Sequence, residues 1–228
     1  MVSIFSMVSI MCLRGLLLVS GLFLSSWALT PEECQPLVTP LSLADPSMMY
    51  NRSHFLVGYS DSAAFGAILK HMESSWWNIS PSPSDPKGIV LAHEDKLNGA
   101  CMSTTANITI EGDTASASVG NVFSTTFHLL PGCDGCLVLS MNTTAKNMDT
   151  MVKLLKINIT VTAEEVNLRC VYLLGREATL KDSDFDDFKK QASCLGFSGE
   201  PQFIYDSKNG YCAEGESVKI ELNIDGDE

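Results

Sequence analysis

Two cysteines separated by two residues, Cys133-Asp-Gly-Cys136, have the spacing of a thiol redox pair or of half a zinc site. Redox chemistry requires a thiol of lowered pKa, typically at a helix N-terminus, whereas this pair lies in a predicted turn between two strands. A zinc site requires a second closely spaced pair of ligands, and the sequence holds none. We therefore expect these cysteines to form structural disulfides.

Other residues that could perform chemistry lack the spacing that chemistry needs. The histidines, none of which has metal-ligand spacing, are His54, His71, His93 and His128. The sequence His-Glu-Asp-Lys-Leu at His93 lacks the second histidine of a zinc protease helix, and Gly-Phe-Ser-Gly at Gly196 lacks the Gly-x-Ser-x-Gly frame of a nucleophile elbow. The sequence thus predicts neither an enzyme nor a metal or cofactor site.

The N-terminus predicts export. An apolar run from Gly15 to Ala28 follows Arg14 and ends in small residues, which is typical of a signal peptide cleaved after Ala28. An uncleaved signal anchor is the alternative, because residues 1–13 are also apolar. We expect a secreted, extracellular protein with one domain over residues 29–228, an acidic tail from about residue 214, and no stable membrane insertion.

The charge of the chain excludes a nucleic-acid partner. The formal net charge is -12, and removing Arg14 with the signal peptide makes it -13. Phosphate binding needs clustered lysine and arginine, and the sequence shows no such cluster. The acidity is explained by solubility, with attraction of cationic ligands as the alternative.

Cysteines and glycosylation sequons agree with export. The seven cysteines after residue 28 are Cys34, Cys101, Cys133, Cys136, Cys170, Cys194 and Cys212. In a secreted chain these are half-cystines, and an odd number leaves one over; the pairing among Cys133, Cys136 and Cys170 stays open. The sequons begin at Asn51, Asn78, Asn107, Asn142 and Asn158. Asn78 is the weakest acceptor, because Pro81 follows its serine.

The elements that position these residues are short β-like runs separated by turn signals. They are His54–Tyr59, Ser75–Ser80, Lys87–His93, Cys101–Glu111, Thr114–Val119, Val122–Leu130, Leu137–Thr143 and Val166–Leu174. Eight such runs predict an all-β antiparallel sandwich or barrel. The connection over residues 144–165 holds Met-Val-Lys-Leu-Leu-Lys-Ile-Asn-Ile-Thr, an extra strand or an element that the sequence does not define.

The sequons predict which way the strands face, because a glycosylated asparagine points to solvent and strand side chains alternate. Asn107, Asn142, Asn158 and Asn78 on the outside place apolar neighbours inside. Those neighbours are Trp77, Ile79, Ala106, Ile108, Ile110, Leu137, Leu139, Met141, Ile157, Ile159 and Val161.

One segment predicts a helix. Phe185, Phe188, Ala192 and Leu195 recur at helical spacing, three aspartates fill the first turn, and Gly196 suits the C-terminal stop. We expect Asp182 or Ser183 to cap it and the phenylalanine stripe to pack outside the sheet.

Several segments resemble known proteins. The segments Pro-Glu-Glu-Cys at residue 31, NGACMSTTANITIEGDTAS at residue 98 and ASCLGFSGEPQFIYDSKNGYC at residue 192 are similar to lipocalins of the orosomucoid and apolipoprotein M branch. They and GCDGCLVLSM at residue 132 most closely resemble the pufferfish saxitoxin- and tetrodotoxin-binding proteins. The resemblance implies an eight-stranded antiparallel up-and-down β-barrel with one C-terminal α-helix packed outside and a disulfide-strapped tail.

The resemblance also implies the disulfides. In orosomucoid-like chains the bridges correspond to Cys34 with Cys194 and Cys101 with Cys212. The tail would then lie on the barrel with its aromatic residues Phe197, Phe203 and Tyr205.

The chain departs from the family at the barrel floor and in the fifth strand. Ser53-His54-Phe55 stands where the lipocalin signature has Gly-x-Trp, so Arg176 would have to stack on Phe55. A basic residue that orosomucoid carries in the fifth strand corresponds here to Ala117, which removes one partner for an anionic head group.

We therefore expect binding and transport of a small lipophilic or amphiphilic ligand, neutral or cationic, and on the resemblance a toxin-like molecule, by a monomer. The residues expected to line the cavity are Val57, Trp77, Ile79, Ile108, Ile110, Phe123, Phe127, Leu137, Leu139 and Met141. The alternative is a secreted inhibitory or immune-modulating glycoprotein that acts through its loops on a protein partner.

Overall fold

The computed structural model describes residues 29–219 except residues 84, 86, 87, 121, 156 and 159. The predicted signal peptide and the last part of the acidic tail lie outside these residues. The strands are β1 (Asn51–Ser60), β2 (Met72–Pro81), β3 (Gly88–Leu97), β4 (Ala100–Glu111), β5 (Thr114–Val119), β6 (Phe123–Leu130), β7 (Cys136–Lys146), β8 (Glu165–Gly175), β9 (Phe203–Ile204) and β10 (Val218–Lys219). The helices are α2 (Pro31–Val38), the 3-10 helix η1 (Pro46–Met49), α3 (Ala63–Lys70), α4 (Met148–Leu154) and α5 (Asp182–Cys194).

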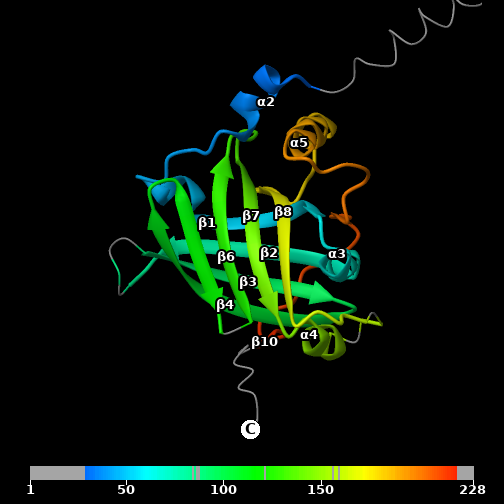
Figure 1. The fold of residues 1–228 in the computed structure, drawn as a ribbon. Coiled ribbons are helices and arrows are strands. Elements are labelled where there is room, and N and C mark those ends of the chain that lie inside the picture. Colours follow the sequence, from blue (N-terminus) through cyan, green and yellow to red (C-terminus); the bar gives the residue numbers. More distant parts are fainter. Residues whose placement is uncertain are drawn as a thin grey trace, which may run out of the picture.

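Strands β1 to β8 form one closed antiparallel barrel. Each strand pairs with the next along the chain, β4 also pairs with β5, and β1 pairs with β8 to close the ring. Because the barrel is closed, each of these eight strands has a hydrogen-bonded neighbour on both sides. Figure 1 shows the barrel with α5 outside it near β8 and α2 at the top. The expected eight-stranded up-and-down barrel with an external C-terminal helix is confirmed.

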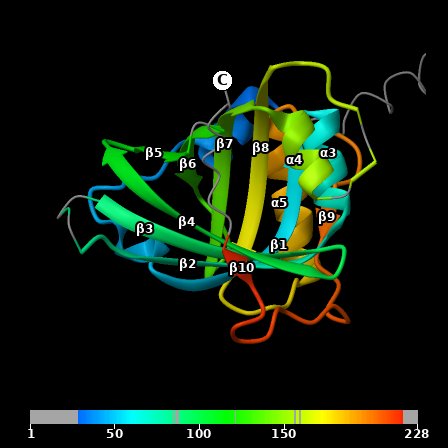
Figure 2. The same ribbon diagram turned by 90° about the horizontal axis from the view of Figure 1, so that it is seen from below.

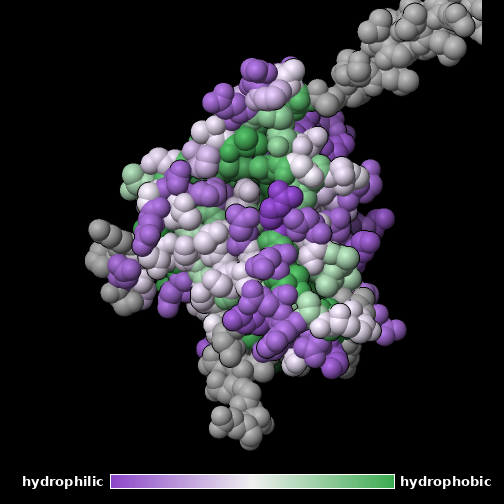
Figure 3. Space-filling view, viewed as in Figure 1, coloured by the Kyte–Doolittle hydropathy of each residue, from purple (hydrophilic) through white to green (hydrophobic). Residues whose placement is uncertain are grey.

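The strand orientations predicted from the sequons are confirmed in β4 and β7. Asn107 and Asn142 are exposed, while Ile108 and Leu139 are each 1% exposed and belong to the interior cluster. The outer face in Figure 3 is mostly hydrophilic, with hydrophobic side chains gathered below α2. Period-2 alternation therefore separates an apolar interior from a solvated exterior, as one buried sheet face requires.

Helix α5 packs on the outside of the barrel through its phenylalanine stripe. Phe188 and Ala192 are buried against outward side chains of β1 and β8, with Phe185 and Leu195 at the margin. The predicted cap was wrong: Lys181 holds the N-cap position without a side-chain hydrogen bond. Because the helix begins at Asp182, the predicted capping residues lie in its first turn, where Asp182 still faces the positive end of the helix dipole.

The C-terminal tail returns across the barrel and is attached to it by strand pairing and by a disulfide. Strand β9 pairs with β1 at Gly58↔Phe203, and β10 runs parallel to β4, as Figure 2 shows. The Cys34–Cys194 bridge joins α2 to the end of α5, and Cys101–Cys212 joins β4 to the tail. Both pairings implied by the resemblance, and the strapped tail, are confirmed.

The pairing that the sequence left open is settled by the turn between β6 and β7. Cys133 and Cys136 are joined to each other across this turn, which leaves Cys170 on β8 as the free cysteine of the described residues. Cys170 is buried, and burial raises the pKa of its thiol to about 11. The free thiol is therefore uncharged at neutral pH.

The barrel floor differs from the predicted contact between Arg176 and Phe55. The Arg176 guanidinium instead donates hydrogen bonds to Met48 O at 2.9 Å and to Ser53 Oγ at 2.8 Å, which ties η1 to the start of β1. Phe55 packs against the rings of Tyr172 and Phe203, at centroid distances of 4.5 and 4.6 Å. The prediction of a stacked Arg176 was wrong because the aromatic tail residue takes the place beside Phe55.

A glycine in β1 makes room for this aromatic group. A Cβ at Gly58 would lie 2.5 Å from Phe55 Cζ, closer than any side chain tolerates. The absence of a side chain at residue 58 lets the Phe55 ring fold over its own strand and reach β9.

The connection between β7 and β8 contains helix α4, and its described residues form no extra strand. Met148 and Val152 are 0% and 1% exposed, and Ile157, in the irregular segment that follows, is 4% exposed. Asn158 is exposed, as predicted, but the segment around it is not a strand; Ile159 lies outside the described residues.

Candidate ligand-binding cavity

The barrel encloses a cavity with a volume of about 250 Å³. This volume lies just below the range of roughly 300–1,000 Å³ that is usual for small-molecule sites. The lining side chains come from all eight barrel strands, from α3 and from the segment after α4. They are Phe55, Phe65, Ile68, Leu69, Met72, Ser75, Trp77, Leu91, His93, Asp95, Leu97, Met102, Thr104, Ala106, Ala117, Phe123, Thr125, Met141, Thr143, Leu155 and Tyr172.

Two helices inserted between strands cover one end of this cavity. Helix α3, in the β1–β2 connection, contributes Phe65, Ile68 and Leu69 to the lining, and Leu155 follows α4 in the β7–β8 connection. Figure 2 shows α3 and α4 on the same side of the barrel. Because both helices also bury residues in the interior cluster, they belong to the packed core and restrict access to the cavity.

The lining carries one pair of opposite charges. His93 and Asp95 lie two residues apart on β3, so both point inward, and His93 Nδ1 lies 3.1 Å from Asp95 Oδ2. Their side chains keep 24% and 20% of their surface accessible, and both residues line the cavity. Among the described lining residues they are the only ones that are charged at neutral pH.

Burial and the contact between the two residues shift their pKa values in opposite directions. Burial by itself would lower the pKa of His93, but the negative charge of Asp95 raises it above the ordinary histidine value. Burial would likewise raise the pKa of Asp95, but the positive charge of protonated His93 lowers it below the ordinary value. Each partner therefore favours the charged form of the other.

These shifts predict how the pair affects stability with pH. Because the folded pKa of Asp95 is lowered, its contribution is present above the ordinary value of about 3.9 and is lost as the pH falls through the folded value. Because the folded pKa of His93 is raised, its contribution is present below about 6.5 and is lost as the pH rises through the folded value. We expect urea unfolding to show the largest loss for Asp95→Asn between about pH 4 and 6.5.

The exposed residue Asp134, in the β6–β7 turn, gives a matched control for this measurement. Asp134→Asn removes the same charge without a cavity partner, and its effect should stay small across the same pH range. A loss for Asp95→Asn that does not vary with pH would contradict the ion pair.

Aromatic side chains surround the charged pair. The Trp77 ring lies 6.0 Å from the His93 ring and meets the Tyr172 ring edge-on at 6.1 Å. Burial raises the pKa of Tyr172 well above its ordinary value, and its contact with Cys170 acts in the same direction. The phenol therefore stays neutral and presents a polar group without charge.

The sequence prediction of the cavity lining is met in part. Trp77, Phe123 and Met141 line the cavity. The residues that pack in the interior cluster without lining the cavity are Ile79, Ile108, Ile110, Phe127, Leu137 and Leu139. The inward assignment of Val57 was wrong, since it packs in the outer cluster under α5. A register shift between Phe55 and Val57 interrupts the alternation, so Leu56 and Val57 both face outward.

His93 and Asp95 are charged lining residues that the sequence prediction missed. The predicted run ended at His93, whereas β3 continues to Leu97. Ile89 and Leu91 already define an inward face, and extending that alternation by four residues places His93 and Asp95 on it. Alternation within β3 is therefore a signal that could have located both residues.

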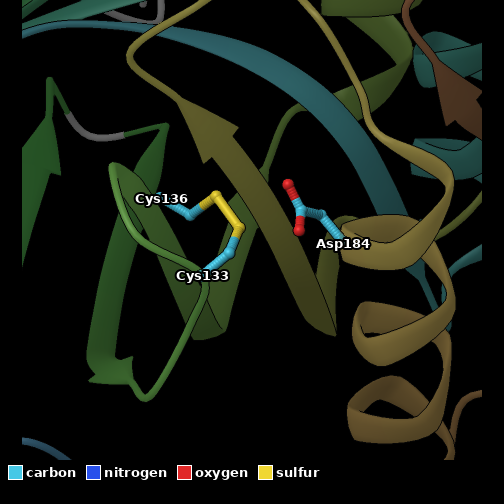
Figure 4. A group of neighbouring side chains, drawn as sticks. All are labelled: Cys133, Cys136 and Asp184. Atoms are coloured by element: carbon cyan, nitrogen blue, oxygen red, sulfur yellow. A yellow bond between two sulfur atoms is a disulfide. The ribbon is translucent and has the colours of Figure 1, made fainter.

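A cluster of possible metal ligands lies outside the barrel, as Figure 4 shows. Cys133, Cys136 and Asp184 place one ligand atom each within 4.8 Å of one another. Both sulfur atoms are joined in a disulfide, so the cluster offers a single carboxylate and no thiolate.

The sequence of this chain matches no protein-family model and no curated protein. Among solved structures, the siderocalin Ex-FABP superposes with a TM-score of 0.53 and 12% sequence identity, covering 71% of this chain and 96% of that chain. The fold is that of a lipocalin. At this identity the likeness shows the lipocalin fold and nothing finer.

Two further solved structures were found with lower scores. The bovine lipocalin allergen Bos d 2 has a TM-score of 0.47 and 13% identity and covers 67% of this chain and 88% of that one. A bovine odorant-binding protein has a TM-score of 0.45 and 14% identity and covers 72% of this chain and 91% of that one.

Among the described residues of this lipocalin fold, no helix combines the length and apolar character needed to cross a membrane.

Proposed function

We propose that this chain is a secreted glycoprotein of the orosomucoid-like lipocalin branch that binds and carries a small lipophilic or amphiphilic ligand in its barrel. The observation that supports this is a cavity of about 250 Å³ in the barrel, lined mostly by aliphatic and aromatic side chains. Burying an alkyl chain in such a lining contributes about 0.8 kcal/mol per CH₂. The similarity to Ex-FABP, described as functioning through dual ligand specificities, agrees with a binding role.

The charges of the lining favour a neutral or cationic head group. Ala117 lines the cavity. By resemblance it corresponds to a basic residue of orosomucoid, so this position provides no cation for an anionic ligand. The one cation of the described lining, His93, is already neutralised by Asp95. An acid would have to compete with that carboxylate, whereas an alcohol or an amine would not.

A binding role accounts for the site better than catalysis does. The free thiol of Cys170 is held protonated by burial, with its pKa raised to about 11, which disfavours it as a nucleophile. We propose a monomeric carrier without a cofactor.

Tryptophan fluorescence tests the proposal, because the two indoles after residue 28 have different surroundings. Trp77 lines the cavity, while Trp76 faces outward and donates a hydrogen bond from Nε1 to Glu94 Oε1 at 2.8 Å. Titration with a medium-chain alcohol is expected to change the emission of the wild type and of Trp76→Phe. The Trp77→Phe variant should lose most of this change while calorimetry finds its affinity within about tenfold of wild type.

Two outcomes of that titration are decisive. A response carried by Trp76 would place the ligand outside the barrel. No binding of any alcohol, amine or fatty acid by calorimetry would favour the alternative function, in which loops of the glycoprotein contact a protein partner.

Export is tested by mapping the secreted protein. Peptide mapping is expected to find an N-terminus at Leu29 and sugar on the exposed asparagines Asn51, Asn107, Asn142 and Asn158. Asn78 is half-buried and precedes Ser80-Pro81, so we expect partial occupancy there. Sugar-free Asn107 and Asn142 in protein from a eukaryotic secretory host would contradict export through that route.

A further inference from the structure

The Asp95–His93 pair is a charge site inside an otherwise apolar cavity. The His93 Nδ1 to Asp95 Oδ2 distance is 3.1 Å, and both side chains border the cavity. The register places Ser75 and Trp77 of β2 directly opposite the two residues. Any ligand in this cavity therefore meets the carboxylate of Asp95. Among the described lining residues its only charged partner is protonated His93, which becomes neutral when it loses one proton.

We propose that Asp95 binds the ammonium group of a protonated alkylamine, and that the incoming ammonium displaces the proton of His93, so that each bound amine releases one proton. This inference rests on the proposed binding of an amphiphile and names its head group. Before binding, the imidazolium balances the carboxylate; afterwards the ammonium balances it, the imidazole is neutral and the proton is in solvent. One positive charge enters the site and one leaves it.

The physical reason is that the single, partly buried carboxylate of Asp95 stabilises one neighbouring cation well and two poorly. Burial favours neutral His93 and is offset by Asp95. An ammonium within about 4–6 Å of the imidazole adds repulsion and takes over the carboxylate, so the raised pKa of His93 falls on binding. An anionic head group has the opposite effect, because it must displace or protonate Asp95.

The other groups that face the pair carry no charge at neutral pH. Ser75 and Trp77 come from β2, and Met102 and Thr104 of β4 are the register partners of Asp95 and His93. Tyr172 faces them from β8 with a pKa raised by burial and by Cys170. From α3 the lining receives only apolar side chains, those of Phe65, Ile68 and Leu69.

The ionic neighbours along β3 are engaged elsewhere. Glu94 bonds to Trp76 and Ser217, and Lys96 Nζ lies 3.7 Å from Glu73 Oε2. Strand alternation places Glu94 and Lys96 on the outer face, so they do not compensate a proton lost from His93.

Calorimetry with octylamine, octanol and octanoate tests the proposal on the full-length secreted protein. Measuring each ligand in two buffers of different protonation enthalpy gives the number of protons exchanged. We expect octylamine to release nearly one proton at about pH 6, with an affinity that rises about tenfold per pH unit up to the folded pKa of His93. Octanol should bind without proton exchange.

Three variants assign the effect to its residues. His93→Gln should bind octylamine with no proton release and no pH dependence. Asp95→Asn should lower the octylamine affinity by about 10- to 100-fold and that of octanol by less than about threefold. Glu94→Gln, an outward neighbour on the same strand, should behave as wild type.

The outcomes separate this inference from the proposed function. If octanol binds but octylamine binds no tighter and releases no proton, the inference fails and the proposed function stands. Tightest binding of octanoate with proton uptake also overturns the inference, since the head group would then be an anion. If none of the three ligands binds, both the inference and the proposed function fail.

Discussion

Replacing both cysteines of the Cys101–Cys212 bridge by alanine is expected to lower the free energy of unfolding by about 4–5 kcal/mol. The bridge spans 111 residues of sequence, so removing it restores a large loop entropy to the unfolded chain. Domains have a total stability of about 5–15 kcal/mol, so a loss of this size removes a large share of it. Urea unfolding followed by circular dichroism measures the loss.

The Cys133–Cys136 bridge provides the control on the same chain. It spans only 3 residues of sequence, and the same chain-entropy account gives about 2 kcal/mol for its removal. Equal losses for the two double variants would show that loop entropy does not determine the contribution of the long bridge.

Replacing Phe55 by alanine is expected to cost about 3–5 kcal/mol and to lower the melting temperature by roughly 6–20 °C. The side chain is 1% exposed and contacts the rings of Tyr172 and Phe203 at the junction of β1, β8 and β9. The substitution removes these contacts and leaves a void that the closed barrel cannot fill by collapse. Thermal unfolding by calorimetry measures the effect.

Two further variants control this prediction. Phe185→Ala makes the same deletion at a half-buried residue of α5 and should cost less than half as much. Gly58→Ala places a Cβ against the Phe55 ring, so its cost should fall when it is combined with Phe55→Ala. Additive losses in the double variant would show that Gly58 is not required for this contact.

The eight barrel strands could be predicted from local patterns. Period-2 alternation, turn residues and the outward orientation of Asn107 and Asn142 each depend on a few neighbouring residues and agree with the structure. Helix α5 was predictable for the same reason, since Phe188 and Ala192 share one face at helical spacing.

The cavity could not be predicted from those patterns. Leu137, Leu139 and Ile108 face inward as predicted, yet they fill the interior, while α3 and Leu155 contribute lining residues from connections outside the barrel strands. Whether an inward side chain meets another side chain or a void depends on which residues lie across the barrel, and those are distant in sequence.

The sequence by itself determined the positions of the strands, the facing of those that carry sequons and the external helix, and by resemblance the up-and-down barrel and the two long bridges. Only the tertiary structure decided that Cys133 pairs with Cys136, that Val57 turns outward after a register shift, and that Arg176 bonds to η1. It also placed His93 and Asp95 together in the cavity. Alternation and spacing are properties of one segment, whereas bridge choice, bulges and charged pairs in a cavity depend on the packing of several segments.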